Sequence, residues 1–196
     1  MFKLGLTGGI GSGKTLVCQI FEKLGIPVYY ADTAARDLMN TDPQLKVGIR
    51  QMFGEEAFGE DGLNRQYLAD SVFGDPEKLS GLNELVHPAV RKDFFQWSLQ
   101  QKGSPYVLEE AAILFESGAI TGMDLSVLVY APEELRISRV MKRDGLRRED
   151  VLKRMGHQMS EEKKLEMADH VLINDGSRLL LPQVIDLHNN MLNRRD

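Results

Sequence analysis

A run of eight residues near the start of the chain, Gly8 to Thr15, fits the pattern G-x-x-x-x-G-K-[ST] in full. Glycines at this density let the backbone form a concave ring of N–H groups that approaches phosphate oxygens closely. Lys14 adds a positive charge for the β- and γ-phosphates, and the Thr15 hydroxyl is suited to binding Mg²⁺. The spacing therefore predicts a nucleoside triphosphate site, since a dinucleotide site would need G-x-G-x-x-G. The alternative is a glycine-rich turn that binds nothing.

The segments around this loop have the order that such a site needs. The apolar run Phe2 to Leu6 predicts a strand, and apolar residues three and four apart predict a helix over 14–24. A helix that begins at the loop directs its first N–H groups at a bound anion. Ile26 to Tyr30 predicts a second strand.

Asp32 follows this second strand directly. In an open parallel sheet, ligands gather at the carboxyl ends of the strands, so Asp32 is expected on the same edge as the phosphate loop. An aspartate near the γ-phosphate can accept the proton of an acceptor hydroxyl. The alternative is that Asp32 caps a helix over 33–39, and both roles are compatible.

Residues 36–102 show mostly helical spacing and predict a helical insertion. The candidate helices are about 44–53, 64–73, 76–86 and 88–101. We expect His87-Pro88 to separate the last two helices, because the residue before proline avoids the helical region. A lone histidine of this kind is usually structural. An insertion of this size can hold a bulky acceptor, which favours phosphoryl transfer to a hydroxyl.

The core is expected to resume with strands at 106–110 and 125–131. The first of these strands ends in Glu109 and Glu110, and Glu110 stands where an aspartate that supports Mg²⁺ is usual. Ser160 is expected to cap a helix over 161–168.

A last strand over 170–174 ends in Asn174-Asp175-Gly176. The simplest interpretation of this tripeptide is a turn. Because it lies at the carboxyl end of a strand, it is also a candidate wall of the adenine site. A final helix with Pro182 in its first turns completes the predicted fold.

Three arginines, Arg136, Arg139 and Arg143, lie on one face of a predicted helix over 133–144. For most of the basic residues here, a solvated charged face is the simplest interpretation. Arg139 and Arg143 are the exceptions, because they follow a core strand closely and could fold over a triphosphate.

The composition is that of an ordinary globular protein: 196 residues, 42% hydrophobic and 27% charged, with one cysteine. A net charge of −5 argues against a broad nucleic-acid surface. No apolar run is long enough to span a bilayer. The first predicted strand begins so early that we expect no cleavable signal, and one cysteine excludes an internal disulfide. We therefore expect a cytoplasmic protein.

Several further motifs, taken in order, resemble the dephospho-coenzyme A kinase family over nearly the whole chain. They are Leu6 to Thr15, Ala31-Asp32 with Ala35-Arg36, Asp61 to Arg65, Leu82-Asn83 with His87-Pro88 and Arg91, Leu114 to Glu116, Arg139 with Arg143-Asp144, Gln158, and Ala168-Asp169 with Asn174. The resemblance implies ATP-dependent phosphorylation of the ribose 3′-hydroxyl of dephospho-coenzyme A. It also implies the fold class: an α/β, three-layer P-loop NTPase core with a parallel sheet, a helical acceptor-binding insertion and an arginine-bearing lid.

In this family reading, the core comprises 1–35, 103–135 and 159–196, the acceptor domain 36–102 and the lid 136–158. The resemblance implies a small-molecule acceptor, no nucleic acid or membrane, and a monomer or weak oligomer. The implied site residues fall into four groups. They are the catalytic Lys14, Asp32 and Arg143; the ATP-binding Gly8, Gly9, Gly11, Ser12, Gly13, Lys14, Thr15, Leu16, Arg139, Asn174 and Gly176; the acceptor-binding Asp32, Arg36, His87, Arg91 and Glu116; and the Mg²⁺-binding Thr15 and Glu110.

The chain departs from the family pattern in three places. Tyr30 stands where an acidic residue usually precedes Ala31, Ala112-Ile113 replaces Pro-Leu, and Glu110 replaces aspartate. Two rival functions also fit the loop: a kinase of the same architecture with another acceptor, such as a nucleoside or nucleoside monophosphate, and an ATP-dependent switch without an acceptor. A GTPase is disfavoured because no Asn-Lys-x-Asp element occurs.

Overall fold

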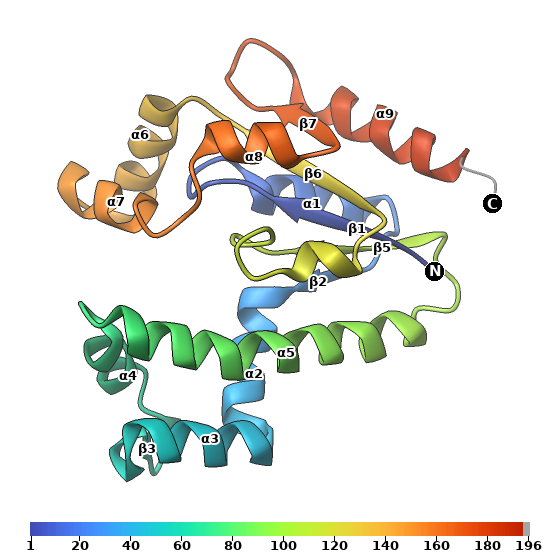
Figure 1. Ribbon diagram of the computed structural model, residues 1–196. Coiled ribbons are helices and arrows are strands. Elements are labelled where there is room, and N and C mark those ends of the chain that lie inside the picture. The colour runs from blue at the N-terminus through green and yellow to red at the C-terminus, as the bar shows by residue number, and fades with distance from the viewer. Residues whose placement is uncertain (194–196) are drawn as a thin grey trace. The chain divides into compact units, whose positions relative to one another are not determined.

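The computed structural model describes residues 1–193, and the chain divides into two compact units (Figure 1). The first unit comprises Met1–Tyr30 and Ser98–Asp196, and the second comprises Ala31–Trp97. The predicted lid residues, 136–158, lie in the first unit.

The first unit is built on a five-stranded parallel sheet with the strand order β2-β5-β1-β6-β7. The strands are β1 (Phe2–Thr7), β2 (Val28–Tyr30), β5 (Tyr106–Glu110), β6 (Leu125–Tyr130) and β7 (His170–Ile173). In the sheet register, Leu6 of β1 lies beside Glu110 of β5, which in turn lies beside Tyr30 of β2. The carboxyl ends of these three strands therefore meet at one edge, as predicted.

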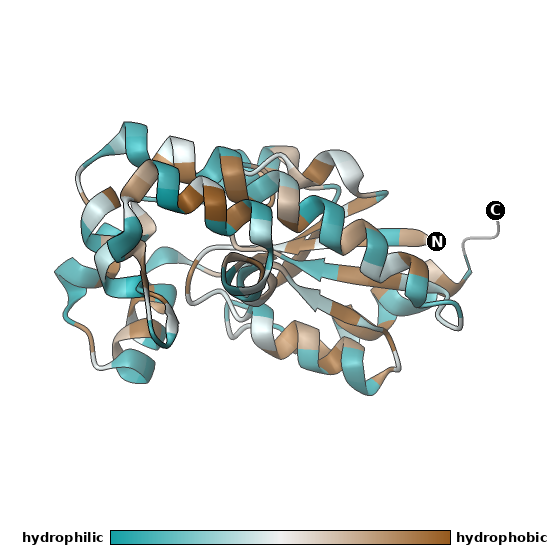
Figure 2. Cartoon of the chain, turned by 90° about the horizontal axis from the view of Figure 1, so that it is seen from below, coloured by the Kyte–Doolittle hydropathy of each residue, from teal (hydrophilic) through white to brown (hydrophobic). Residues whose placement is uncertain are grey.

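Helices pack against both faces of this sheet. α1 (Lys14–Lys23) and α9 (Leu180–Leu192) cover one face and share a core with the strands. The other face carries α8 (Glu161–Met167) and the short 3₁₀ helix η2 (Ala119–Gly122). Figure 2 shows hydrophobic residues on both strands and helices, with hydrophilic stretches between them along the helices. This arrangement confirms the predicted three-layer α/β core.

Two further helices follow β6. α6 (Glu133–Asp144) and α7 (Arg148–Met155) pack together through Ile137, Val140 and Val151, which are all buried. The sequence predicted α6 at these bounds but did not predict α7, because its residues are mostly charged.

The second unit is mainly helical. It contains α2 (Ala31–Thr41), α3 (Pro43–Phe53), α4 (Arg65–Val72) and most of α5 (Pro76–Gln100). Between α3 and α4 lie a 3₁₀ turn, η1 (Glu55–Ala57), and a small hairpin of β3 (Phe58–Gly59) and β4 (Gly62–Leu63). Its core includes Ile49, Phe53, Ala57 and Leu68.

Two predictions for this unit were wrong. α5 runs through His87-Pro88 without a break. Proline removes one intrahelical hydrogen bond, but Pro88 and Glu84 both lie on the exposed side, while the buried Val86, Val90 and Phe94 hold the helix from the other side. α2 begins at Ala31, so Asp32 lies in its first turn rather than at the cap position.

Across residues 1–193, no helix combines the length and the apolar character that crossing a bilayer requires.

Candidate functional site

The glycine-rich loop joins β1 to α1 at the carboxyl edge of the sheet. Gly11 and Gly13 have φ angles of 82° and 102°, in the left-handed region that favours glycine. Gly13 is the N-cap of α1 and has no side chain to bond the first N–H groups of that helix. The first N–H groups of an α-helix lack partners within the helix, which makes this helix end a suitable anion site.

Lys14 lies across the mouth of the loop. Its Nζ donates a hydrogen bond to the carbonyl of Gly8 at 2.7 Å. The same Nζ lies 3.9 Å from Oε1 of Glu110, which ends β5. The structure thus brings a cation from the loop and a carboxylate from the neighbouring strand to the same edge.

A cavity of about 390 Å³ lies over the loop and the start of α1. Seven of the residues predicted to act at the site line it. These seven are Gly11, Gly13, Lys14, Thr15, Leu16, Arg139 and Arg143. Nucleotide-sized ligands commonly occupy cavities of a few hundred Å³ with a small number of convergent polar groups.

Arg139 and Asn174 form one network with the loop. Arg139 donates from Nη2 to the carbonyl of Asn174 at 3.0 Å and from Nη1 to that of Gly11 at 3.4 Å. Asn174 in turn donates from Nδ2 to the carbonyl of Ser12 at 2.7 Å. These bonds hold the turn after β7 against the loop, on the side where the sequence predicted the adenine wall. Gly176 lies in the same turn, with φ 87°.

Arg143 is exposed at the rim of the cavity and forms a two-fold hydrogen-bonded ion pair with Asp144. Its Nε and Nη2 donate to the two carboxylate oxygens of Asp144 at 2.7 and 3.0 Å. These hydrogen bonds raise the pKa of Arg143 and lower the pKa of Asp144. The guanidinium remains fully charged at the edge of the phosphate site.

Sequence reasoning missed the role of Arg136. The residue is buried, with 4% exposure, so its assignment to a solvated face was wrong. It forms an ion pair with Glu161 beneath the loop, at 3.8 Å between Nη1 and Oε1. The sequence carries no signal that pairs these two residues, because they come from different helices separated by α7.

A second buried cation, Lys164, anchors the segment that follows β5. Its Nζ lies 3.3 Å from the carbonyl of Ala112 and 3.4 Å from Oε1 of Glu116. Glu116 also accepts a hydrogen bond from the backbone N–H of Met159 at 2.7 Å. The carboxylate of Glu116, predicted to bind the acceptor, therefore binds groups of the first unit.

The other predicted acceptor residues lie in the second unit. Asp32 and Arg36 stand one turn apart on α2, and both are exposed. His87 and Arg91 stand one turn apart on α5. Burial, followed by the positive charge of Arg91, lowers the pKa of His87. His87 is therefore mostly neutral near pH 7.

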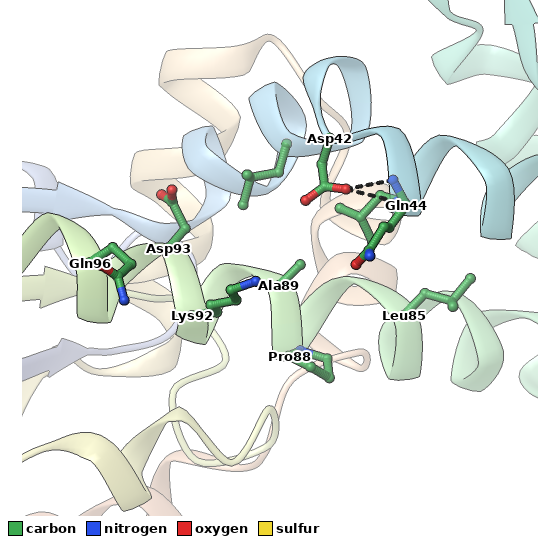
Figure 3. A pocket seen from close by; sticks show the side chains of 10 residues that line it. Asp42, Gln44, Leu85, Pro88, Ala89, Lys92, Asp93 and Gln96 are labelled. Carbon is green, nitrogen blue, oxygen red and sulfur yellow. Dashed lines mark hydrogen bonds between the residues drawn. The ribbon is translucent and has the colours of Figure 1, made fainter.

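The second unit has a cavity of about 400 Å³ between α5 and the α2–α3 corner (Figure 3). At that corner, Asp42 caps α3 by accepting from the N–H groups of Gln44 and Leu45. Neither His87 nor Arg91 lines this cavity. Its lining is Leu38, Asp42, Gln44, Leu45, Leu85, Pro88, Ala89, Lys92, Asp93 and Gln96.

The donor set at the loop suits Mg²⁺ that arrives with a nucleotide. Among the described residues, no three His, Cys, Asp or Glu side chains gather into a metal site of their own. Mg²⁺ is usually held by one or two carboxylates together with phosphates and waters, so it needs no such cluster. The Thr15 hydroxyl and the Glu110 carboxylate fit that requirement.

Comparisons with known proteins agree with this geometry. A family model described as dephospho-CoA kinase matches residues 2–179. A dephospho-CoA kinase of Bacteroides fragilis is 40% identical over 185 residues, covering 94% of this chain and 90% of that protein. One of Salinibacter ruber is 44% identical over 181 residues, covering 90% of each chain.

Solved structures give the same picture. A crystal structure from Thermus thermophilus is 37% identical, with a TM-score of 0.85 and 98% coverage of both chains. The dephospho-CoA kinase from Campylobacter jejuni is 25% identical, with a TM-score of 0.70, and covers 98% of this chain and 97% of its own. A shikimate kinase from Bacteroides thetaiotaomicron, 12% identical with a TM-score of 0.55, shares the P-loop fold alone. The match of the family model, the identity to full-length relatives and the loop geometry agree: this chain belongs to the dephospho-CoA kinase family.

Proposed function

We propose that this protein transfers the γ-phosphoryl group of ATP to the ribose 3′-hydroxyl of dephospho-coenzyme A, giving coenzyme A and ADP. The observation that carries the proposal is the family match over residues 2–179, which coincides with a loop, a cation and a carboxylate assembled at one sheet edge. The reaction would be the last step of coenzyme A biosynthesis.

ATP is the co-substrate, and the loop from Gly8 to Thr15 binds its phosphates. The N–H groups at the start of α1 and the Lys14 ammonium neutralise the β- and γ-phosphates. Leu16, which lines the cavity, lies beside them. The Arg139–Asn174 network holds the turn that contains Gly176 against the loop, which supports the proposal that this turn contacts the adenine ring.

Thr15 and Glu110 would hold Mg²⁺. When bound, the ion neutralises charge on the β- and γ-phosphates. Glu110 sits at the end of β5, where its longer side chain can act through water in place of aspartate. Its proximity to Lys14 supports this assignment.

Asp32 is the proposed base for the acceptor hydroxyl. It follows β2 by two residues, and β2 ends at the same sheet edge as the loop. Its carboxylate orients the hydroxyl and accepts its proton while the phosphoryl group transfers in line. Arg36, His87 and Arg91 bind the rest of the acceptor within the helical domain. Glu116 is also proposed to bind the acceptor, in addition to its contacts with Lys164 and Met159.

Residues 136–158 are proposed to form a lid over the triphosphate, with 36–102 as the acceptor domain and the remaining residues as the core. Arg143 at the rim of the cavity would neutralise charge that develops on the transferring group. Lid closure would exclude water and so prevent hydrolysis of ATP.

We also propose that the protein acts in the cytoplasm as a monomer or weak oligomer, on a small-molecule substrate and without nucleic acid or membrane. The net charge of −5 supports the expectation that no nucleic acid is bound.

An acceptor panel tests the function. The purified protein is incubated with MgATP and, separately, dephospho-coenzyme A, nucleosides, nucleoside monophosphates, shikimate or no acceptor, and ADP release is measured. Release that depends on dephospho-coenzyme A is expected. Faster release with another acceptor would indicate a different kinase, and acceptor-independent slow hydrolysis would indicate a switch protein.

A further inference from the structure

Two buried, oppositely charged side chains lie directly beneath the phosphate loop. Arg136 is 4% exposed and Glu161 is 8% exposed. Arg136 donates from Nε to the carbonyl of Ala131 at 3.0 Å, and its Nη1 lies 3.8 Å from Oε1 of Glu161. Burying two charges costs more free energy than a pair at this separation usually returns. A buried pair of this kind needs a reason other than stability.

The loop packs against Arg136 at two glycines that the phosphate-loop pattern does not require. A Cβ at Gly11 would lie 2.6 Å from the carbonyl oxygen of Arg136. A Cβ at Gly9 would collide with Nη1 of Arg136 and lie 2.5 Å from Oε1 of Glu161. Gly9 does not have a positive φ angle, so the contact with the pair, rather than the backbone conformation, requires glycine there.

The segment that leads into α8 also contacts the loop. The backbone N–H of Ile10 donates to Oε1 of Gln158 at 2.9 Å. Gln158 and Glu161 therefore hold consecutive parts of the loop from one side, while Arg136 of α6 supports it from beneath. These contacts involve three consecutive residues of the loop, Gly9, Ile10 and Gly11.

The Arg136–Glu161 pair also leaves one buried polar atom without a hydrogen bond, which costs free energy of folding. Oε2 of Glu161 is buried and has no hydrogen-bond partner among the described residues. A buried carboxylate oxygen without a partner destabilises the folded state. Retention of a charge in this position is expected where the charge serves the site.

We propose that Arg136, held by Glu161, is a positioning residue that fixes the Gly9–Gly11 backbone in the shape that binds the triphosphate. It touches no substrate itself. The inference rests on the proposed function only in that the loop binds ATP, and it is independent of the acceptor.

A neutral double variant separates positioning from stability. In Arg136→Met with Glu161→Leu, both charges are replaced together, so the free energy of unfolding should stay the same or rise. The dissociation constant for MgATP should nevertheless rise by about tenfold or more, because small displacements of a binding group have large effects. The KM for ATP should rise in parallel, and the KM for dephospho-coenzyme A should not change.

The measurement is a calorimetric titration of MgATP without acceptor, with denaturant unfolding of the same samples. The matched control is Arg148→Met with Glu134→Leu, which removes an exposed ion pair near the same helices. Wild-type MgATP affinity in the folded double variant would overturn the proposal. If the double variant binds weakly only in proportion to its unfolded fraction, the pair is structural and the proposal is also wrong.

A second variant tests the contact from the loop side. Gly9→Ala should weaken MgATP binding in the wild-type background and have little further effect in Arg136→Ala/Glu161→Ala, where space is available for the methyl group. Equal effects in both backgrounds would contradict the proposed contact. Because both experiments measure nucleotide binding alone, they succeed or fail independently of whether dephospho-coenzyme A is the acceptor.

Discussion

The ammonium of Lys14 lies 3.9 Å from the carboxylate of Glu110 and 2.7 Å from the carbonyl of Gly8. Lys14 begins α1, directly after the loop that follows β1, whereas Glu110 ends β5, and the parallel pairing of β1 with β5 brings the two together. Because Glu110 is close to the cation that we propose binds the phosphates, it is also the residue proposed to support Mg²⁺ there.

Glu110→Gln removes this carboxylate while keeping nearly the same shape. We expect the Mg²⁺ concentration needed for half-maximal rate to rise about 10- to 100-fold, as when a group that supports a metal site is lost. The measurement is the initial rate at fixed ATP across a Mg²⁺ titration. The control is Glu133→Gln, which changes an exposed carboxylate. An unchanged Mg²⁺ dependence in Glu110→Gln would show that Glu110 does not support the metal ion.

Arg143→Ala should lower kcat by about 10²-fold with a smaller change in ATP affinity, because the guanidinium is proposed to act on charge in the transition state. Steady-state kinetics and direct ATP binding are measured together. Arg154 offers a matched control, because it also pairs with Asp144, at 3.6 Å, but does not line the cavity. If Arg143→Ala and Arg154→Ala behave alike, Arg143 has no special role.

The pH dependence of stability follows from two partly buried histidines. Burial lowers the pKa of His170, and burial together with Arg91 lowers the pKa of His87. The unfolded chain, with histidine pKa values near 6.5, therefore binds more protons than the folded chain below that pH. The free energy of unfolding should fall as the pH decreases from about 7 to about 5.5.

Denaturant unfolding at several pH values measures this effect. The variant His87→Gln with His170→Gln should show a flatter dependence over the same range, while the exposed His157→Gln should keep the wild-type slope. An identical slope in the double variant and the wild type would show that other groups cause the dependence.

Local sequence patterns predicted the glycine-rich loop and the ends of the strands beside it. The loop from Gly8 to Thr15 and the strand that ends at Glu110 were recognisable from residue spacing, and their meeting at one edge follows from parallel pairing. The Arg136–Glu161 pair was not predictable, because pairing between side chains on separate helices leaves no periodic signal. The continuous α5 was not predicted, because the local sequence shows only that Pro88 disfavours a helix at His87. The packing of buried residues on one face of α5, which the local sequence does not show, outweighs this effect.

Asp32→Asn tests the proposed base. The amide can still accept a hydrogen bond but is a far weaker base, so kcat should fall by about 10²- to 10⁴-fold. The dissociation constant of MgATP should stay within about twofold of wild type, because Asp32 is proposed to act on the acceptor hydroxyl and not on the nucleotide. Near-normal turnover would show that Asp32 serves only the first turn of α2.

The protein is proposed to phosphorylate one hydroxyl of one acceptor. Mass spectrometry and phosphorus NMR of the product formed from dephospho-coenzyme A and MgATP, with ADP measured in the same reaction, test this directly. We expect one phosphoryl group added per ADP formed, attached at the ribose 3′-hydroxyl. ADP formation without phosphorylated product, or a phosphoryl group at another hydroxyl, would contradict it.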